Sequence, residues 1–305
     1  MAVHAGDRTS EFEALRPRLQ AVAYRLTGSV ADAEDIVQDA WLRLHSATAE
    51  IEDLPAWLTT VVSRLGLDRL RSAVYRRETY VGEWLPEPVV TGLDGSDPLA
   101  VLVAGEDARF AAMVVLDRLA PDQRVAFVLH DGFSVPFKQI AEILGIGDAA
   151  ARQLASRARR AVTATPEPAA DAEHNEAVGQ LLAALISGSM EAVVRVLHPD
   201  VTMTGDSDGK APTAVRVIHG PDKVARFLLG LMERYGPHMT QAMNPALVNG
   251  QFGMYLTATP ADTADSGYWP VLPRVSAFTV HDGRVLAVWD VCNPDKFTGT
   301  PLRNA

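Results

Sequence analysis

Residues 126–160 read AFVLHDGFSVPFKQIAEILGIGDAAARQLASRARR, and this stretch has the spacing of a helix-turn-helix. Apolar residues recur at helical intervals up to Leu144, and Gly145 stands where the turn between two helices needs a positive φ. The second helix exposes a face without acids, formed by Arg152, Gln153, Ser156, Arg157, Arg159 and Arg160. Such a helix fits a DNA major groove, where Arg, Gln and Ser read base edges or grip phosphate. The pattern favours DNA binding; the alternative is a helical hairpin whose arginines are only solvated.

A second basic helix is predicted upstream, over residues 56–77 (AWLTTVVSRLGLDRLRSAVYRR). Its apolar stripe begins at Trp57 and ends at Leu70. The other face carries one acid, Asp68, and five arginines: Arg64, Arg69, Arg71, Arg76 and Arg77. Because the whole chain has a net charge of -10, two basic helices concentrate any nucleic-acid affinity at two places. Four aromatic rings lie in or just beyond this segment: Trp57, Tyr75, Tyr80 and Trp84. Such rings can stack on unpaired bases or pack in a core, and for Trp57, which belongs to the apolar stripe, we favour packing in the core.

An acidic helix precedes the basic one. Ser29 is expected to cap it, and its buried stripe runs from Ile36 to Leu44. Its exposed face carries Asp32, Asp35 and Asp39. This face cannot usefully meet phosphate, so it either lies in water or contacts a basic protein surface.

Residues 8–163 resemble an extracytoplasmic-function sigma factor of bacterial RNA polymerase. Four motifs carry the resemblance: DAEDIVQDAWLRL (32–44), AWLTTVVSRLGLDRLRS (56–72), LAPDQRVAFVLHDGFSVPFKQIAEILG (119–145) and AAARQLASRARRAV (149–162). The resemblance implies that the Asp32, Asp35 and Asp39 face docks on the clamp helices of the largest polymerase subunit. It further implies that the helix around 64–77 engages the melted minus-10 element and that the helix at 152–160 reads the minus-35 element. Leu65 and Ala151 depart from the residues usual in the family.

Length and composition fit a multidomain protein. A chain of 305 residues is long enough for two or three cores, and its single cysteine, Cys292, cannot form an internal disulfide. No signal-peptide core and no run of about 18 apolar residues is present, so we expect a cytoplasmic protein without a membrane contact. The expected order is sigma region 2 at 8–77, a linker at 78–105, sigma region 4 at 106–163, a second linker at 164–173 and a C-terminal domain at 174–305.

The C-terminal segment changes pattern from helices to strands. Helices are predicted at 174–187, 190–197 and 224–235, and strands at 246–249, 253–258, 274–281 and 285–291. This order predicts an α+β cone. It resembles a SnoaL-like domain of the nuclear-transport-factor-2-like superfamily. The predicted fold class is therefore multidomain, with two all-α domains for DNA and polymerase binding, the second a helix-turn-helix, followed by this cone.

Three short motifs resemble those of one sigma-factor group that carries such an extension. The group has a WLPEP linker motif, a DGGGK-type loop and an NPDKL-type tail. Here these are Trp84, Leu85, Pro86, Glu87 and Pro88; Asp206, Ser207, Asp208, Gly209 and Lys210; and Asn293, Pro294, Asp295, Lys296 and Phe297. The loop departs by having Ser and Asp where two glycines are usual. An apolar, proline-stiffened linker is typical of a docking peptide, so we expect it to bind the C-terminal domain and regulate the protein in cis.

The C-terminal domain could also carry another function. His198, Asp200, His219, Trp269, Trp289 and Asp290 could approach a pocket, but they form no recognisable catalytic set, and no enzyme activity is expected. A small-molecule ligand in this domain stays open, and with it the alternative of a ligand-sensing transcription regulator. No cofactor or metal is expected, since a calcium loop at Asp206 and Asp208 would lack its other ligands.

Overall fold

The computed structural model describes residues 5–77, 80–94, 97–163, 169–259 and 267–303. The chain forms two compact units. The helical unit comprises Met1–Thr79, Val101–Ala108 and Ala112–Thr165, and the C-terminal unit comprises Tyr80–Ala100, Arg109–Ala111 and Pro166–Ala305. The segment expected to be a linker at 78–105 is therefore divided between the two units.

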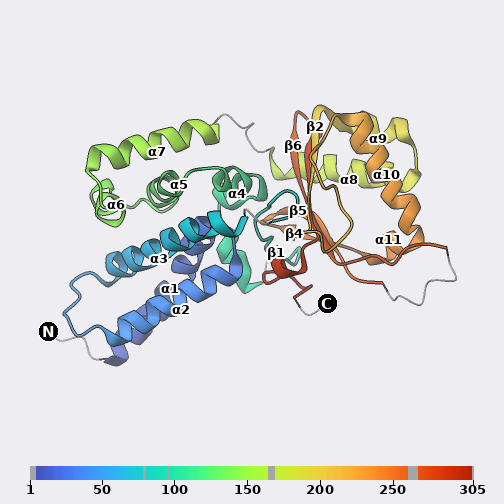
Figure 1. Cartoon of the computed structure of the whole chain (residues 1–305). Helices are drawn as coiled ribbons and strands as arrows, with labels where there is room; N and C mark the ends of the chain where they lie inside the picture. Colours follow the sequence, from blue (N-terminus) through green and yellow to red (C-terminus); the bar gives the residue numbers. More distant parts are fainter. Residues whose placement is uncertain (1–4, 78–79, 95–96, 164–168, 260–266, 304–305) are drawn as a thin grey trace. The chain divides into compact units, whose positions relative to one another are not determined.

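Three long helices open the helical unit: α1 (Ala5–Thr27), α2 (Val30–Ser46) and α3 (Leu54–Arg77) (Figure 1). The Ser29 side chain accepts a hydrogen bond from the Asp32 amide at 3.0 Å, which confirms the predicted N-cap. The apolar stripes of the helices form a common core that includes Leu19, Val22, Ile36, Val37, Leu44, Leu58 and Val62. At Gly66 a Cβ would lie 3.0 Å from the Leu26 side chain, so a small residue lets α1 and α3 approach closely.

Four further helices follow: α4 (Phe110–Asp117), α5 (Pro121–Phe127), α6 (Phe137–Leu144) and α7 (Asp148–Thr163). Gly145 ends α6 with a φ of 69°, the left-handed conformation predicted for the turn. Buried Ala151, Ala155 and Ala158 set the inner face of α7. The helix-turn-helix prediction is confirmed.

A buried arginine holds residues 101–108 against α1. Arg25 is 3% exposed, and its guanidinium donates to the carbonyls of Leu102 at 3.0 Å and Ala104 at 2.6 Å. It also pairs with Asp107 at 2.7 Å. Arg124 on α5 donates to the carbonyl of Arg25 at 2.9 Å. Because a buried guanidinium needs its donors satisfied, this network fixes α1, α5 and the segment before α4 relative to one another.

The C-terminal unit is an α+β fold, as predicted. Its helices are α8 (Asp171–Ser187), α9 (Met190–Val196), α10 (Pro221–Tyr235) and α11 (Pro237–Ala242). Its strands are β2 (Leu197–Asp206), β3 (Ile218–His219), β4 (Met243–Val248), β5 (Gln251–Leu256), β6 (Arg274–His281) and β7 (Arg284–Val291). A short 3-10 turn, Pro294–Lys296, follows β7.

Among the described residues the sheet has seven strands in the order β1-β4-β5-β6-β7-β2-β3. The antiparallel meander β4 to β7 matches the prediction, but β2 was not anticipated and pairs in parallel with β7. One edge strand of the sheet is β1 (Val90–Thr91), which comes from the linker and pairs with β4. Apolar side chains of α8, α9 and α10 share one core with the strands, among them Val178, Leu181, Val193, Val224, Phe278 and Val288.

His174 on α8 anchors this helix to the sheet. Its ring is buried, and Nε2 donates to the carbonyl of Phe252 at 2.9 Å. Burial lowers the pKa of His174 below its ordinary value, although the Phe252 carbonyl and Asp171 act in the opposite direction. The neutral ring is therefore the form that the fold prefers.

We expect His174 to destabilise the C-terminal unit in acid. Below about pH 6.5 the unfolded state binds a proton that the folded state resists, so the free energy of unfolding falls as the pH falls. The loss is at most about 1.4 kcal/mol per pH unit and ends at the folded pKa. Urea unfolding at pH 7.5 and 5.5 measures it. His174→Gln, whose amide can donate to the same carbonyl without titrating, should lose less; equal losses in the two proteins would contradict the prediction.

Candidate functional site

The outer face of α7 is open to solvent within the helical unit. Arg152, Gln153, Arg157 and Arg160 are exposed, and Ser156 is half-buried. Arg159 differs, because it pairs with Asp131 at 2.6 Å. The Arg152 guanidinium lies over the ring of Phe137, the first residue of α6, 5.5 Å from its centre. This face is a row of basic and amide donors on a helix that can enter a groove.

The basic side chains of α3 make contacts inside the helical unit. Arg64 is exposed and donates to the Glu142 carbonyl at 3.2 Å, and Arg71 pairs with Asp122 at 3.1 Å. The side chains of Arg76 and Arg77 lie outside the described residues. Exposed contacts of this kind contribute at most about 1 kcal/mol each, so they hold these side chains only weakly.

Arg69 connects the basic helix to the acidic one. It pairs with Asp32 at 2.8 Å and approaches Asp35 at 3.5 Å. Asp35 and Asp39 are exposed, while Asp32 is half-buried. The acidic face thus meets one basic side chain of its own unit and leaves Asp39 at the surface.

The linker is bound to the C-terminal unit through a buried ion pair. Asp206, the last residue of β2, is 0% exposed and pairs with Lys296, which is 3% exposed, at 2.6 Å. The Asp206 carboxylate also accepts from the Leu85 amide at 2.6 Å and from the Tyr80 hydroxyl. Lys296 donates to the Leu85 carbonyl and lies 3.3 Å from the centre of the Trp84 ring. We call Tyr80, Trp84, Leu85, Asp206 and Lys296 the linker-docking cluster.

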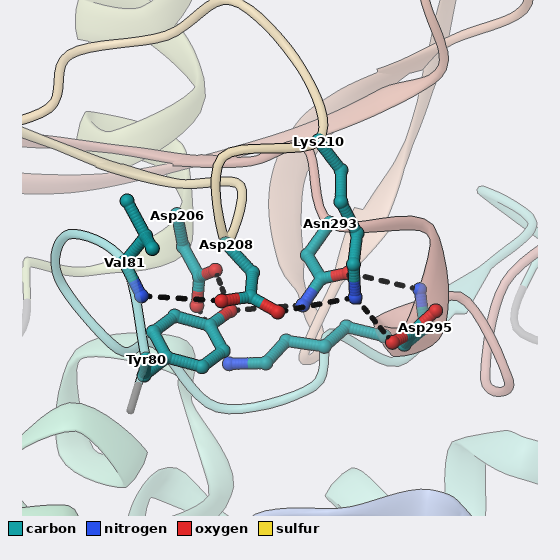
Figure 2. Close-up of polar contacts among 8 residues, drawn as sticks. Tyr80, Val81, Asp206, Asp208, Lys210, Asn293 and Asp295 are labelled. Carbon is teal, nitrogen blue, oxygen red and sulfur yellow. Dashed lines mark hydrogen bonds and ion pairs between the residues drawn. The ribbon is translucent and has the colours of Figure 1, made fainter. Parts of the chain in front are cut away.

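The loop at 206–210 and the tail surround this cluster. Figure 2 shows Asp208 accepting from the Val81 amide at 3.1 Å, and Asn293 donating to the Tyr80 hydroxyl at 2.9 Å. Lys210 bridges loop and tail, because it pairs with Asp208 at 3.1 Å and with Asp295 at 2.5 Å. The structure therefore brings together all three motifs that the sequence singled out.

Two pKa shifts reflect these contacts. Burial, and then the neighbouring Asp206 carboxylate, raise the pKa of Tyr80 far above its ordinary value, so the phenol stays a donor. The hydrogen bond from the Val81 amide, followed by that from Lys210, lowers the pKa of Asp208. The raised pKa keeps the Tyr80 hydroxyl protonated and the lowered pKa keeps Asp208 ionised. These are the forms in which Tyr80 donates and Asp208 accepts the hydrogen bonds between linker and loop.

Beyond the cluster the linker continues as part of the sheet. Residues 85–91 are buried. The Val89 amide donates to the Asn249 side chain at 3.0 Å, and the Val90 amide donates to the Gly299 carbonyl at 2.8 Å. Val90 and Thr91 then form β1, the strand added beside β4. The linker is thus recognised by strand addition, with main-chain bonds and buried side chains together.

Sequence reasoning missed Tyr80 and Asn249 as binding residues. Tyr80 was considered only as a ring that stacks on bases or packs in a core, whereas its hydroxyl donates a hydrogen bond to Asp206. Asn249 lies in the turn after β4 with a φ of 50°, and the only sequence signal for it is the Asn-Gly pair of a tight turn. The sequence does not indicate that either residue binds the linker or its docking site, because the partner residues are more than 100 positions away.

The C-terminal unit also holds residues 109–111. Arg109 pairs with Asp171 at 3.2 Å, and the Phe110 ring lies 6.4 Å from that of Trp289. Phe110 is buried, although it is the first residue of α4. A second short segment, which the sequence analysis placed within residues 106–163, is therefore part of the C-terminal unit.

The residues considered for a pocket are mostly dispersed. Of the six, only Asp290 lines the interior cavity of the unit. His198 lies beside His281 instead, with ring centres 5.9 Å apart, and Trp269 is 53% exposed. Cys292 is buried, and burial followed by the Asp290 charge raises the pKa of its thiol, as a packed cysteine requires.

Two features are absent from the described residues. Within them no cluster of three or more His, Cys, Asp or Glu side chains could hold a metal ion. No helix in the described parts of the chain combines the length and the hydropathy needed to cross a bilayer.

Comparison with known proteins matches both helical regions. Residues 12–75 match the Sigma-70 region 2 family, and residues 109–162 match the Sigma-70, region 4 family. The chain is 65% identical over 299 residues to the ECF RNA polymerase sigma factor SigJ of Mycobacterium tuberculosis, covering 96% of this chain and 94% of that protein. It is 34% identical over 307 residues to the probable ECF RNA polymerase sigma factor SigI of the same species, covering 97% and 96%.

A solved structure agrees with this similarity. The crystal structure of the Mycobacterium tuberculosis extracytoplasmic function sigma factor SigJ superposes with a TM-score of 0.84 at 64% identity. The superposition covers 96% of this chain and 99% of that one. The resemblance therefore includes the C-terminal unit as well as the two helical regions.

Proposed function

Because the chain belongs to the extracytoplasmic-function sigma factors of RNA polymerase, we propose that it directs core polymerase to promoters under the control of its own C-terminal unit. Sigma factors are transcription initiation factors, and no catalytic role is proposed for this chain. A ligand-sensing regulator would need only one DNA-binding domain, whereas this chain matches both sigma regions.

Promoter contacts are assigned to the two basic helices. The exposed face of α7 (Arg152, Gln153, Ser156, Arg157 and Arg160) reads the minus-35 element through base edges and phosphates. On α3, Arg64, Arg69, Arg71, Arg76 and Arg77 hold the melted minus-10 strand. Arg69 and Arg71 exchange their carboxylate partners for phosphate when DNA binds, since both pairs are partly exposed.

Polymerase binding is assigned to the acidic face of α2. We expect Asp39→Lys to weaken binding to core polymerase at least about tenfold, because a reversed charge at a complementary interface is repelled. Asp39 is tested alone, since Asp35 and Asp32 already contact Arg69. Calorimetric titration with core enzyme measures the affinity.

The matched control is Glu34→Lys, which makes the same charge change at an exposed position on another side of α2. It should bind core polymerase like the wild type. If both variants bound equally well, α2 would not be the docking face.

One observation supports the proposal of control in cis: the linker is bound to the C-terminal unit. The buried Lys296 and Asp206 pair, and the strand β1, attach the linker to the C-terminal unit. The linker joins the two promoter-binding regions, so a bound linker limits the positions that they can take on polymerase. Free and docked linkers are the two states of a switch that the C-terminal unit biases.

Trp84→Ala and deletion of 293–305 should both uncouple the linker. The first removes a ring stacked on Lys296, a contact worth about 2 kcal/mol when desolvated, and the second removes Lys296 itself. In reconstituted transcription with core polymerase, both should change promoter-dependent output at least about tenfold and in the same direction.

Trp269→Ala is the control, because Trp269 is a half-exposed tryptophan of the same unit that stacks on Arg234. It should leave output unchanged. Identical output from the full chain, Trp84→Ala and the tail deletion would end the proposal of control in cis while leaving the sigma activity intact.

A further inference from the structure

One arginine of α7 differs from the others in its surroundings. Arg159 donates from Nε at 2.8 Å and from Nη2 at 2.6 Å to the same carboxylate oxygen of Asp131. Among the residues that the structure describes, it is the only arginine of α7 with an ion pair to a carboxylate. Arg159 follows Arg152 by about two helical turns, so both stand on the same side of the helix, at the edge of its exposed face.

Asp131 reaches α7 from an unusual turn. The segment Val128–Gly132 continues α5 as a π-helical turn, a rare geometry that often occurs at functional sites. Within it the ring of His130 stacks on Phe137 of α6, with the ring centres 3.8 Å apart, and the next residue, Asp131, contacts α7. The turn therefore fixes the Asp131 carboxylate beside the helix that is assigned to the minus-35 element.

The Asp131 carboxylate opposes a contact between Arg159 and DNA. An arginine adds affinity for any DNA sequence when it neutralises a phosphate and releases counterions. Arg159 would first have to break two hydrogen bonds, and the carboxylate would then face the phosphates unpaired. Arg71 on α3, by contrast, donates a single nitrogen to Asp122 at 3.1 Å. The Arg159 side chain is 47% exposed, so it lies near enough to the surface to reach a bound duplex once it is free.

We propose that Asp131 limits the sequence-independent affinity of the protein for DNA by keeping Arg159 from the phosphate backbone. Asp131 is thus a positioning residue, which acts through Arg159. The proposal rests on the assignment of α7 to the minus-35 element, where Arg152, Arg157 and Arg160 supply the basic contacts. Because a genome offers far more other sites than promoters, a smaller sequence-independent affinity leaves less polymerase bound to other DNA.

Asp131→Asn frees Arg159 without changing the size of the side chain. Holoenzyme reconstituted from the full-length protein and core polymerase is titrated with a labelled promoter duplex and with the same duplex carrying an altered minus-35 element. The variant should bind both duplexes at least about fivefold more tightly at about 50 mM salt. The slope of log affinity against log salt should steepen by about 0.9, so the gain should be about threefold smaller at about 200 mM salt.

Arg159→Gln should act in the opposite direction. It leaves the Asp131 carboxylate unpaired beside the phosphates and should weaken binding at least about threefold at the same low salt. In the double variant both groups are uncharged amides, and the affinity should return to within about twofold of the wild type. A pair that only held α7 in place would predict weaker binding for both single variants.

Glu191→Gln is the matched control, because Glu191 pairs with Arg195 at 2.9 Å in the C-terminal unit. It removes the same charge and also frees one arginine, yet it should not alter the affinity for either duplex. A gain as large as that of Asp131→Asn would show a general effect of net charge and overturn the proposal.

The double alanine variant of Arg152 and Arg157 separates this proposal from the assignment of α7. If that variant binds the promoter weakly while Asp131→Asn binds like the wild type or more weakly, Asp131 does not restrain Arg159, and α7 still reads the minus-35 element. If neither variant changes binding, α7 does not meet DNA, and both proposals fail.

Discussion

Replacing Lys296 by Met should release the linker from the C-terminal unit. Asp206 is 0% exposed, so removal of the ammonium leaves a buried carboxylate without its counter-charge, at a cost of about 3–5 kcal/mol. The Leu85 carbonyl loses its donor in the same step. Hydrogen exchange measures the release: the Leu85 and Val89 amides, which donate to Asp206 and Asn249, should exchange at least about a hundredfold faster.

Lys223→Met makes the same change in charge at an exposed position of α10 and should leave these amides protected. Continued protection of Phe278 and Val288, in β6 and β7, will show that the sheet of the variant is folded. If that sheet is folded and the Leu85 and Val89 amides exchange as in the wild type, the ion pair does not hold the linker.

Removing Arg152 and Arg157 together should abolish promoter-specific transcription. Each arginine that reads a base contributes about 1–3 kcal/mol, so the double alanine variant should lose at least about thirtyfold in output from a cognate promoter. Part of the Arg152 effect comes from its contact with the Phe137 ring, which also orients the side chain. Affinity for core polymerase should be unchanged, because the acidic face of α2 is intact.

The control removes two exposed arginines from the C-terminal unit, Arg195 and Arg226. It alters the net charge equally, so any general electrostatic effect on DNA binding appears in both variants. Promoter-specific output that is unaffected by loss of Arg152 and Arg157 would refute the assignment of α7 as the minus-35 reader.

Local patterns were enough to predict the helical unit. Helical periodicity marks α6 and α7, and Gly145 marks the turn between them, because a positive φ is easiest for glycine. Ser29 identified the start of α2 for an equally local reason, since an N-cap bonds to an amide three residues away. Each of these features depends on residues only a few positions apart, so the sequence alone is enough to predict it.

The sheet was predicted less completely. The meander from β4 to β7 follows from alternation and short turns, but β2 was missed because its parallel partner, β7, lies about 85 residues further along the chain. The strand β1 was missed for a related reason. Two residues of a proline-rich segment have no strand pattern of their own and become a strand only beside β4.

The sequence by itself determined the family, the two promoter-binding regions and the three motifs of the regulatory contact. Only the tertiary structure decided how those motifs meet: Lys296 and Asp206, 90 positions apart, form one buried pair, and Tyr80 joins them through its hydroxyl. The physical reason is that burial and charge compensation depend on every group packed around a side chain, and those groups come from distant parts of the chain.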